Sequence, residues 1–141
     1  MSSVPTYHIL TLSGGGYRGL YTATVLAELE AALGRPIASH FDLICGTSAG
    51  GMLALGLAAE IPAIELKALF EERGSCIFGC RSPLRRLLGR WLIAKHDSAG
   101  LREVLTERFQ ETTIGELKHR VLVPAVNYST GRGQFFKTPH H

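Results

Sequence analysis

The sequence has few cysteines and no long hydrophobic run, and each shortage excludes a class of protein. Three cysteines among 141 residues are an odd number, which argues against a disulfide framework and favours a reducing compartment. Cys76 and Cys80 share a C-x3-C spacing, but a zinc site needs further ligands and none is arranged nearby. The longest apolar run, residues 50–59, has about half the length of a membrane span. Because the amino terminus also lacks the pattern of a signal peptide, we expect a cytoplasmic location.

The excess of basic over acidic residues is small as well. The net charge is +3 and the isoelectric point is near 8.9, a bias too weak to predict a nucleic-acid polymer as partner. Apolar residues make up 45% and charged residues 19% of the chain, which is typical of a folded protein rather than a disordered one. The length allows one domain with a real core.

Strands and helices alternate in the predicted order of elements. Runs of apolar and β-favouring residues predict strands over 7–12, 41–45, 120–127 and 134–137. Pro124 indicates an edge or a bend in the third of these strands. Helical spacing predicts helices over 20–33, 49–59, 61–73, 84–96 and 98–109, with a loop over 74–83. This alternation predicts an α/β layered fold with a mainly parallel sheet.

Residues 46–50 read Gly-Thr-Ser-Ala-Gly and match the pattern G-x-S-x-G, in which a strand turns sharply into a helix. The flanking glycines remove Cβ atoms that would collide across the turn, while the central serine adopts strained backbone angles. Its hydroxyl then stands at the N-terminus of the next helix, where the dipole favours a developing anion. The pattern therefore predicts a nucleophile elbow formed by Gly46, Thr47, Ser48, Ala49 and Gly50; the alternative is an ordinary strand–helix turn.

A second glycine cluster, residues 14–19, reads Gly-Gly-Gly-Tyr-Arg-Gly between a predicted strand and a predicted helix. Its consecutive backbone N–H groups can bind an anion. One interpretation is a phosphate cradle of the G-x-G-x-x-G type, although Asp42 is poorly placed to supply the acidic residue that should hold the ribose. A P-loop is excluded because no Gly-Lys-Ser/Thr follows. The other interpretation is an oxyanion hole, which we favour because both glycine sites lie at the carboxyl ends of predicted strands.

Together, the glycine cluster at 14–19 and the elbow at 46–50 resemble the paired motifs of the patatin-like phospholipases, over residues from about 7 to the end. The resemblance implies a three-layer α/β/α fold and hydrolysis of acyl esters in lipids, with no cofactor or metal. It implies Ser48 as the nucleophile and the amides of Gly14, Gly15 and Gly16, steadied by Arg18, as the oxyanion hole. The segment YRGLYTATVLAELE is similar to bacterial members, including cyclic-nucleotide-activated effectors of antiphage defence.

Aspartate is the residue whose shortage matters most for this resemblance. The family uses a Ser–Asp dyad, with the aspartate in an Asp-Gly-Gly or Asp-Gly-Ala motif downstream of the serine. The chain has only Asp42 and Asp97, and neither precedes a glycine. Asp42 lies six residues before Ser48 along an extended strand, about 20 Å away, and Asp97 is better explained as a helix-boundary residue. We therefore expect residues 1–141 to be the N-terminal portion of one patatin-like domain, weakly active or inactive alone, with the catalytic aspartate beyond them.

A basic stretch is the remaining unusual feature. No acidic residue lies between Arg81 and Lys95, and Trp91 and several leucines alternate with the basic residues. The basic residues are Arg81, Arg85, Arg86, Arg90 and Lys95. Such a helix can lie on an anionic bilayer, which would place the protein at the inner face of the membrane. The alternative, which we favour, is an amphipathic helix whose leucines face the core.

The expected partner is a phospholipid or another acyl ester. Two other function classes stay open: a phosphate- or nucleotide-binding module using residues 14–19, and a non-catalytic interaction fragment. An incomplete domain would also leave apolar surface and a sheet edge exposed, which favours a homo-oligomer.

Overall fold

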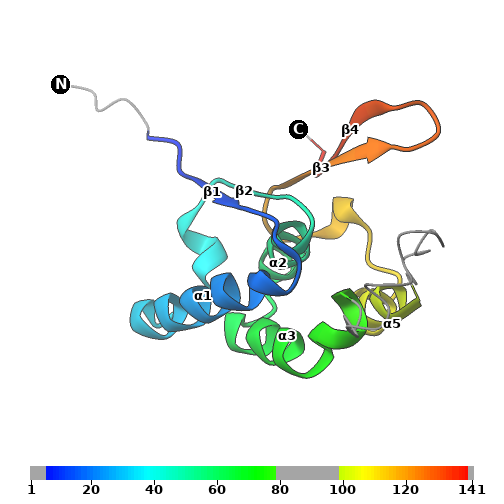
Figure 1. The fold of residues 1–141 in the computed structure, drawn as a ribbon. Coiled ribbons are helices and arrows are strands. Elements are labelled where there is room, and N and C mark those ends of the chain that lie inside the picture. Colours follow the sequence, from blue (N-terminus) through cyan, green and yellow to red (C-terminus); the bar gives the residue numbers. More distant parts are fainter. Residues whose placement is uncertain (1–5, 79–98, 140–141) are drawn as a thin grey trace.

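The computed structural model describes residues 6–78 and 99–139. The basic helix predicted over 84–96, with Arg81, Arg85, Arg86, Arg90 and Trp91 in or beside it, lies outside the described residues. Within them the chain forms a four-stranded sheet with helices packed below it in the view of Figure 1.

The strands lie in the order β1-β2-β3-β4, so each strand pairs with its neighbours in sequence. β1 (Ile9–Leu12), β2 (Leu43–Gly46) and the start of β3 (Val121–Asn127) are parallel. β4 (Arg132–Lys137) returns antiparallel to β3 after a turn at residues 128–131. Leu12 lies opposite Gly46, so β1 and β2 end at the same edge of the sheet. Both glycine-rich segments leave the sheet at that edge.

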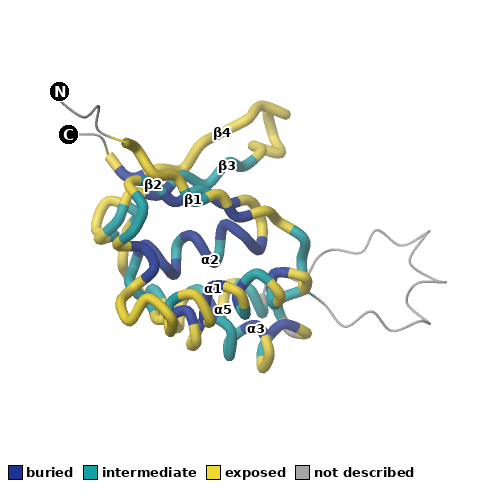
Figure 2. Tube along the Cα trace, turned by 90° about the vertical axis from the view of Figure 1, so that its left-hand side faces the viewer, coloured by how far each residue is buried: buried dark blue, intermediate teal, exposed yellow. Residues whose placement is uncertain are grey.

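The described helices all lie against one face of this sheet (Figures 1 and 2). Their bounds are Gly19–Leu33 for α1, Ala49–Ala58 for α2, Ala63–Phe78 for α3 and Ala99–Phe109 for α5. Three short 3-10 turns span Gly16–Arg18 (η1), Ile37–His40 (η2) and Ile114–Glu116 (η3). α2 lies next to the sheet, and α1 and α3 pack on one another beyond it (Figure 2).

The hydrophobic core lies between the sheet and these helices. α2 is apolar nearly all round because it is enclosed by the sheet on one side and by α1 and α3 on the other. Alternate residues of the strands, Leu12, Ile44 and Val121, are buried against it. From the helix side, Phe70 is the largest fully buried side chain, and Leu53 and Leu57 of α2 are buried with it.

The opposite face of the sheet is apolar but carries no helix within the described residues. By the alternation of the strands this face presents Ile9, Leu43 and Cys45, and farther out Val126 and Phe135. Val126 is 72% exposed and Phe135 is 65% exposed. The α/β architecture and the mainly parallel sheet are confirmed; within the described residues helices cover one face of the sheet.

The loop predicted over 74–83 is wrong at residues 74–78, where α3 continues to Phe78. Phe70, Gly74 and Phe78 are spaced by four residues and so share one face of the helix, and the rings of Phe70 and Phe78 pack 5.7 Å apart. This packing outweighs the low helix propensity of the glycine. The pairing of β3 with β2 ends at Leu122, so Pro124 has a neighbouring strand, β4, on one side only. This is the edge position predicted for Pro124, since proline has no N–H to donate to a second strand.

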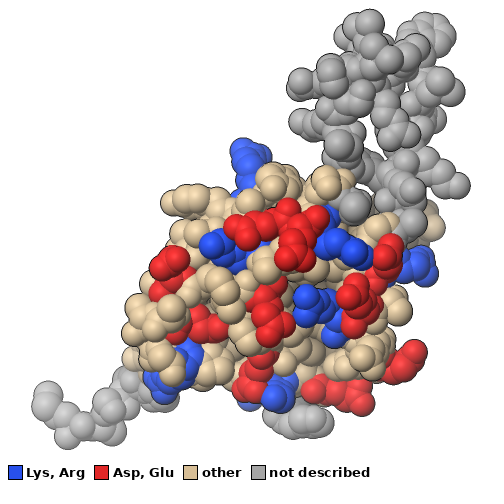
Figure 3. Space-filling model, turned by 90° about the horizontal axis from the view of Figure 1, so that it is seen from below, with Lys and Arg blue, Asp and Glu red and all other residues tan. Residues whose placement is uncertain are grey.

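The helix side of the molecule has a mixed charge distribution. Arg73 pairs with Glu103 at 2.8 Å and Arg108 pairs with Glu65 at 3.3 Å, both between α3 and α5. Figure 3 views this side from below and shows acidic and basic side chains interspersed. On this face of the described residues no broad basic patch gathers that would attract a nucleic acid.

Candidate active site

Ser48 lies at the turn between β2 and α2, as the G-x-S-x-G pattern predicts. It is exposed, and its backbone angles are φ 53° and ψ −123°, outside the regions that a residue with a side chain ordinarily adopts. Its hydroxyl does not cap α2. The oxygen therefore stands free at the positive end of a buried helix.

The two glycines of the elbow are required by close backbone contacts. A Cβ atom at Gly46 would lie 2.1 Å from the carbonyl oxygen of Gly50, and a Cβ atom at Gly50 would lie 2.2 Å from the carbonyl oxygen of Leu12. No side chain fits at either position. The strand, the turn and the helix can thus approach closely enough to raise Ser48 above the end of the sheet.

The glycine cluster lies directly beside the elbow. The Gly14 N–H donates to the Thr47 hydroxyl at 3.0 Å, and the Thr47 N–H donates to the carbonyl of Leu12 at 3.2 Å. A Cβ atom at Gly14 would lie 3.1 Å from the Cβ of Ser48. The structure therefore brings together the two glycine motifs that are 27 residues apart in sequence. The hydroxyl of Thr47 was not singled out from the sequence as the group that joins them.

The backbone amides of Gly15 and Gly16 are the available anion donors of this cluster. Within the described residues neither N–H makes a hydrogen bond, whereas that of Gly14 is engaged by Thr47. They come at the start of η1 and α1, where the first N–H groups of a helix lack internal partners. Gly16 has φ 59°, a left-handed conformation that glycine adopts without strain.

Arg18 folds back over the glycine cluster. The side-chain Nε lies 3.6 Å from the position that a Cβ atom of Gly15 would take. The backbone N–H of Arg18 donates to the Gly15 carbonyl at 3.3 Å. The side chain is exposed. This placement is compatible with the predicted role of Arg18 in steadying the loop, which stays a prediction.

Asp42 does not lie next to Ser48. The Asp42 carboxylate accepts the His8 N–H at 2.7 Å, at the opposite end of β2 from the elbow, where the extended spacing predicts it. Asp97 lies outside the described residues, as does Cys80 of the C-x3-C pair. No group of three His, Cys, Asp or Glu side chains within residues 6–78 and 99–139 is placed to hold a metal.

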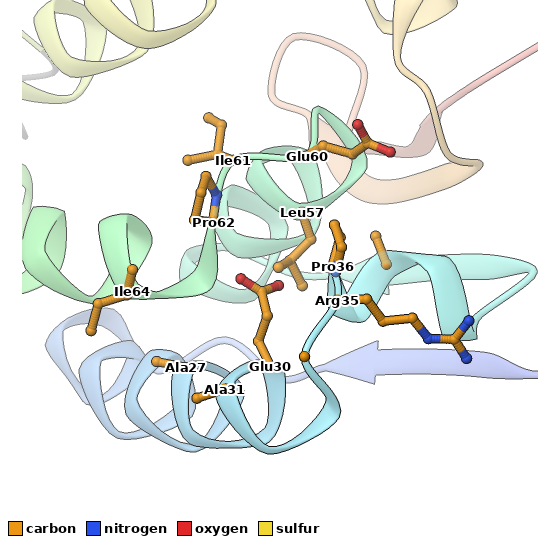
Figure 4. A pocket seen from close by; sticks show the side chains of 12 residues that line it. Ala27, Glu30, Ala31, Arg35, Pro36, Leu57, Glu60, Ile61, Pro62 and Ile64 are labelled. Carbon is orange, nitrogen blue, oxygen red and sulfur yellow. The ribbon is translucent and has the colours of Figure 1, made fainter.

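A cavity of about 310 Å³ lies between the second half of α1 and the junction of α2 with α3 (Figure 4). Leu57 lines it, nine residues beyond Ser48, which is about 14 Å along the helix axis. Glu30 also lines it, and its carboxylate accepts the N–H groups of Ile37 and Ala63 at 2.9 and 2.8 Å. The cavity is therefore separate from the elbow, and Glu30 fixes its shape.

Charged side chains of both signs lie around this cavity. Two carboxylates, those of Glu30 and Glu60, border it against the one guanidinium of Arg35. Hydrogen bonds from Lys118 and then His119 hold the pKa of Glu60 below its usual value, which keeps that carboxylate charged. With Lys118 paired to Glu60, the charges around the cavity balance, so they neither favour nor exclude an anionic ligand.

Comparison with known proteins gives consistent results. A family model described as Patatin-like phospholipase matches residues 10–140. A cGAMP-activated phospholipase of Pseudomonas aeruginosa (strain BWHPSA011 / Pa011) is 88% identical over 141 residues, which cover 100% of this chain and 42% of that protein. A protein of the same name from Escherichia coli (strain TW11681) is 43% identical over 97% of this chain and 41% of its own length.

A plant protein, Patatin-17 of Solanum cardiophyllum, is 30% identical over 91% of this chain and 35% of its own length. The chain thus spans about two fifths of the bacterial relatives it matches. In the part of the chain that the structure describes, every helix is too short or too polar to cross a bilayer.

Proposed function

The chain belongs to the patatin-like phospholipase family, and on this premise we propose that it carries the nucleophile and the oxyanion hole of a serine lipid acyl hydrolase. The observation that supports the proposal most is the bond from the Gly14 N–H to the Thr47 hydroxyl, because it sets free amides beside a strained, exposed Ser48. Parallel pairing of β1 and β2 brings the two strand ends together, and this bond adds a specific contact between the two glycine motifs.

In the proposed reaction the Ser48 oxygen attacks the ester carbonyl carbon and gives its proton to a base. The carbonyl oxygen becomes an oxyanion that accepts hydrogen bonds from the N–H groups of Gly15 and Gly16. Gly14 serves this hole by holding the loop against Thr47. The tetrahedral intermediate expels the alcohol, and water then releases the acyl group from Ser48.

We place the base, an aspartate, outside residues 1–141. The support is the position of Asp42 at the far end of β2 and the greater length of the relatives. We expect the chain alone to hydrolyse a chromogenic short-chain ester slowly, since a serine without its base retains only the contribution of the hole and of binding. Turnover equal to that of the Pseudomonas relative would contradict this.

The direct test of the site is labelling with a fluorophosphonate, which phosphonylates an activated serine. We expect a single adduct at Ser48, located by mass spectrometry, and no adduct in Ser48→Ala. Ser129→Ala is the matched control, because Ser129 is an exposed turn serine remote from the elbow in sequence, and we expect it to leave the labelling unchanged. A folded wild-type chain that is not labelled would remove the proposal that residues 1–141 form a working nucleophile and oxyanion hole by themselves, and a chimera with the Pseudomonas relative that is not labelled at Ser48 would remove the hydrolase proposal.

We also propose phospholipids as the substrate class and activation by a cyclic dinucleotide, as in the names of the bacterial relatives, in a role in antiphage defence. A chimera in which this chain replaces the matching segment of the Pseudomonas relative tests both. We expect phospholipid hydrolysis that requires cGAMP, and none with Ser48→Ala in the chimera. Hydrolysis that is independent of cGAMP would refute the activation.

Contact with a membrane surface is proposed from the basic stretch alone. Reversing Arg85 and Arg86 to glutamate should weaken binding to vesicles that contain phosphatidylglycerol and leave binding to neutral phosphatidylcholine vesicles unchanged. Unchanged binding to the anionic vesicles would remove the proposal. Self-association through the open sheet face, where Val126 and Phe135 are exposed, is tested by light scattering after size exclusion.

The competing phosphate-cradle function has less support. The Gly14 N–H, which a cradle would need, is already engaged by Thr47. The phosphate-cradle function predicts that inorganic phosphate raises the Tm of the chain and that it does so equally in Ser48→Ala.

A further inference from the structure

The C-terminal half of α3 contacts the glycine cluster along one helix stripe. A Cβ atom at Gly19 would lie 2.6 Å from Cε1 of Phe70, and a Cβ atom at Gly74 would lie 2.4 Å from Cε2 of Tyr17. Phe78 lies 3.9 Å from the position of a Gly16 Cβ atom. The three contacting positions of α3 are four residues apart, so they form a continuous surface under residues 16–19.

The contact between Tyr17 and Gly74 is the tightest of the three. The ring lies where any side chain at position 74 would have to be, although glycine is among the least favourable residues in a helix interior. The close approach gives a reason for the glycine. Tyr17 is 51% exposed, so burial of the ring is not the main result of the contact.

Tyr17 immediately follows the two free amides in sequence. Its backbone belongs to η1, between Gly16 and Arg18, so a displaced ring would turn the peptide groups on either side of it. We propose that Gly74 is a positioning residue, which seats the Tyr17 ring on α3 and thereby aims the N–H groups of Gly15 and Gly16 at the acyl oxygen on Ser48. This inference rests on the function proposed above.

The test compares two glycine-to-alanine variants with similar steric conflicts. Gly74→Ala would strike the Tyr17 ring, while Gly56→Ala would strike the Leu66 side chain at 2.5 Å, at the end of α2 that lies away from the elbow. We expect the second-order rate of fluorophosphonate labelling at Ser48 to fall tenfold or more in Gly74→Ala, since loss of one oxyanion donor costs about 10²–10³. In Gly56→Ala the rate should stay within about twofold of wild type, as this glycine touches no element of the hole.

Removing the ring provides a second, independent variant. Tyr17→Ala should also slow the labelling. In the double variant with Gly74→Ala the second change should have no further effect, because the Tyr17 ring with which the new Cβ atom would clash is absent. Independent losses that multiply would overturn the proposal. So would a Tyr17→Ala chain that is labelled at the wild-type rate, and this variant can be measured even if Gly74→Ala does not fold.

A reaction that forms no oxyanion separates positioning from general damage. In a Ser48→Cys background, iodoacetamide alkylates the sulfur by displacing iodide, whereas a p-nitrophenyl ester acylates it through a tetrahedral oxyanion. We expect Gly74→Ala to slow the acylation at position 48 and to leave the alkylation unchanged. Equal slowing of both would mean that Gly74 acts only on the fold.

The two proposals fail in different ways. Absence of labelling at Ser48 both in the wild-type chain and in its chimera with the Pseudomonas relative overturns the hydrolase function and, with it, this inference. Wild-type labelling that Gly74→Ala leaves unchanged overturns the inference alone.

Discussion

Replacing Ser48 by glycine should make the protein more stable, because the serine is held in a strained backbone conformation. Residues kept at such sparsely populated angles cost about 1–3 kcal/mol each. The Ser48 angles of φ 53° and ψ −123° are open to glycine without that cost. Glycine increases the entropy of the unfolded chain, which offsets about 0.5–1 kcal/mol. Since the hydroxyl makes no capping bond, its loss adds little, and we expect a net gain of about 1 kcal/mol.

Urea unfolding of Ser48→Gly and Ser48→Ala measures this strain directly. Alanine keeps the Cβ atom and hence the strain, so the glycine variant should exceed the alanine variant by about 1 kcal/mol, or about 3–5 °C in Tm for a chain of this size. Ser129, an exposed turn residue outside the left-handed region, is the control site, and there glycine should be the less stable of the two. A Ser48→Gly chain no more stable than Ser48→Ala would refute the reasoning.

Three further predictions follow from contacts elsewhere in the molecule. Gly50→Ala should lower the free energy of unfolding by about 3 kcal/mol, because the new Cβ atom meets the backbone oxygen of Leu12, and Gly133→Ala, which meets open space, should cost far less. The pKa of Glu60 is lowered by its hydrogen bond with Lys118, so the contribution of Glu60 to stability is complete above its usual pKa of 4.5 and is lost as the pH falls further. The Tm difference between wild type and Glu60→Gln should therefore shrink on acidification. A difference that does not change with pH would argue against the pairing. Burial raises the pKa of the Cys45 thiol, so iodoacetamide should modify Cys45 more slowly in the folded chain than in urea at the same pH, and equal rates would contradict this.

The elbow could be predicted from the sequence because its constraints are local. Ser48 needs its flanking glycines within two residues, and an apolar strand and helix on either side complete the signal. The distance from Asp42 to the elbow was predictable for the same reason, since the rise of a strand fixes it. Parallel strands further predict that two strand ends meet, which brought the glycine cluster to Ser48.

What the sequence did not predict depends on partners that are distant along the chain. The helix predicted over 61–73 was expected to end before Gly74, where a loop over 74–83 was predicted. Its continuation depends on the ring of Tyr17, 57 residues earlier in the sequence, and on the packing of Phe78. The two hydrogen bonds that Glu30 accepts were missed in the same way, because a charged residue on a helix gives no sign of which amides it will meet.

The carbonyl group of Leu12 has a consequence for substrate choice. It accepts the Thr47 N–H and lies against Gly50, while Thr47 in turn accepts the Gly14 N–H. The spacing between the Ser48 oxygen and the free amides of Gly15 and Gly16 is therefore set by main-chain contacts together with the hydroxyl of Thr47, and the other side chains around the site have little part in it. Under the proposed hydrolase function, proteins that share this arrangement would bind every ester carbonyl in the same way at Ser48 and the free amides. Discrimination between one acyl chain or head group and another must then come from the opposite wall of the site, which is free to diverge while the chemistry stays constant.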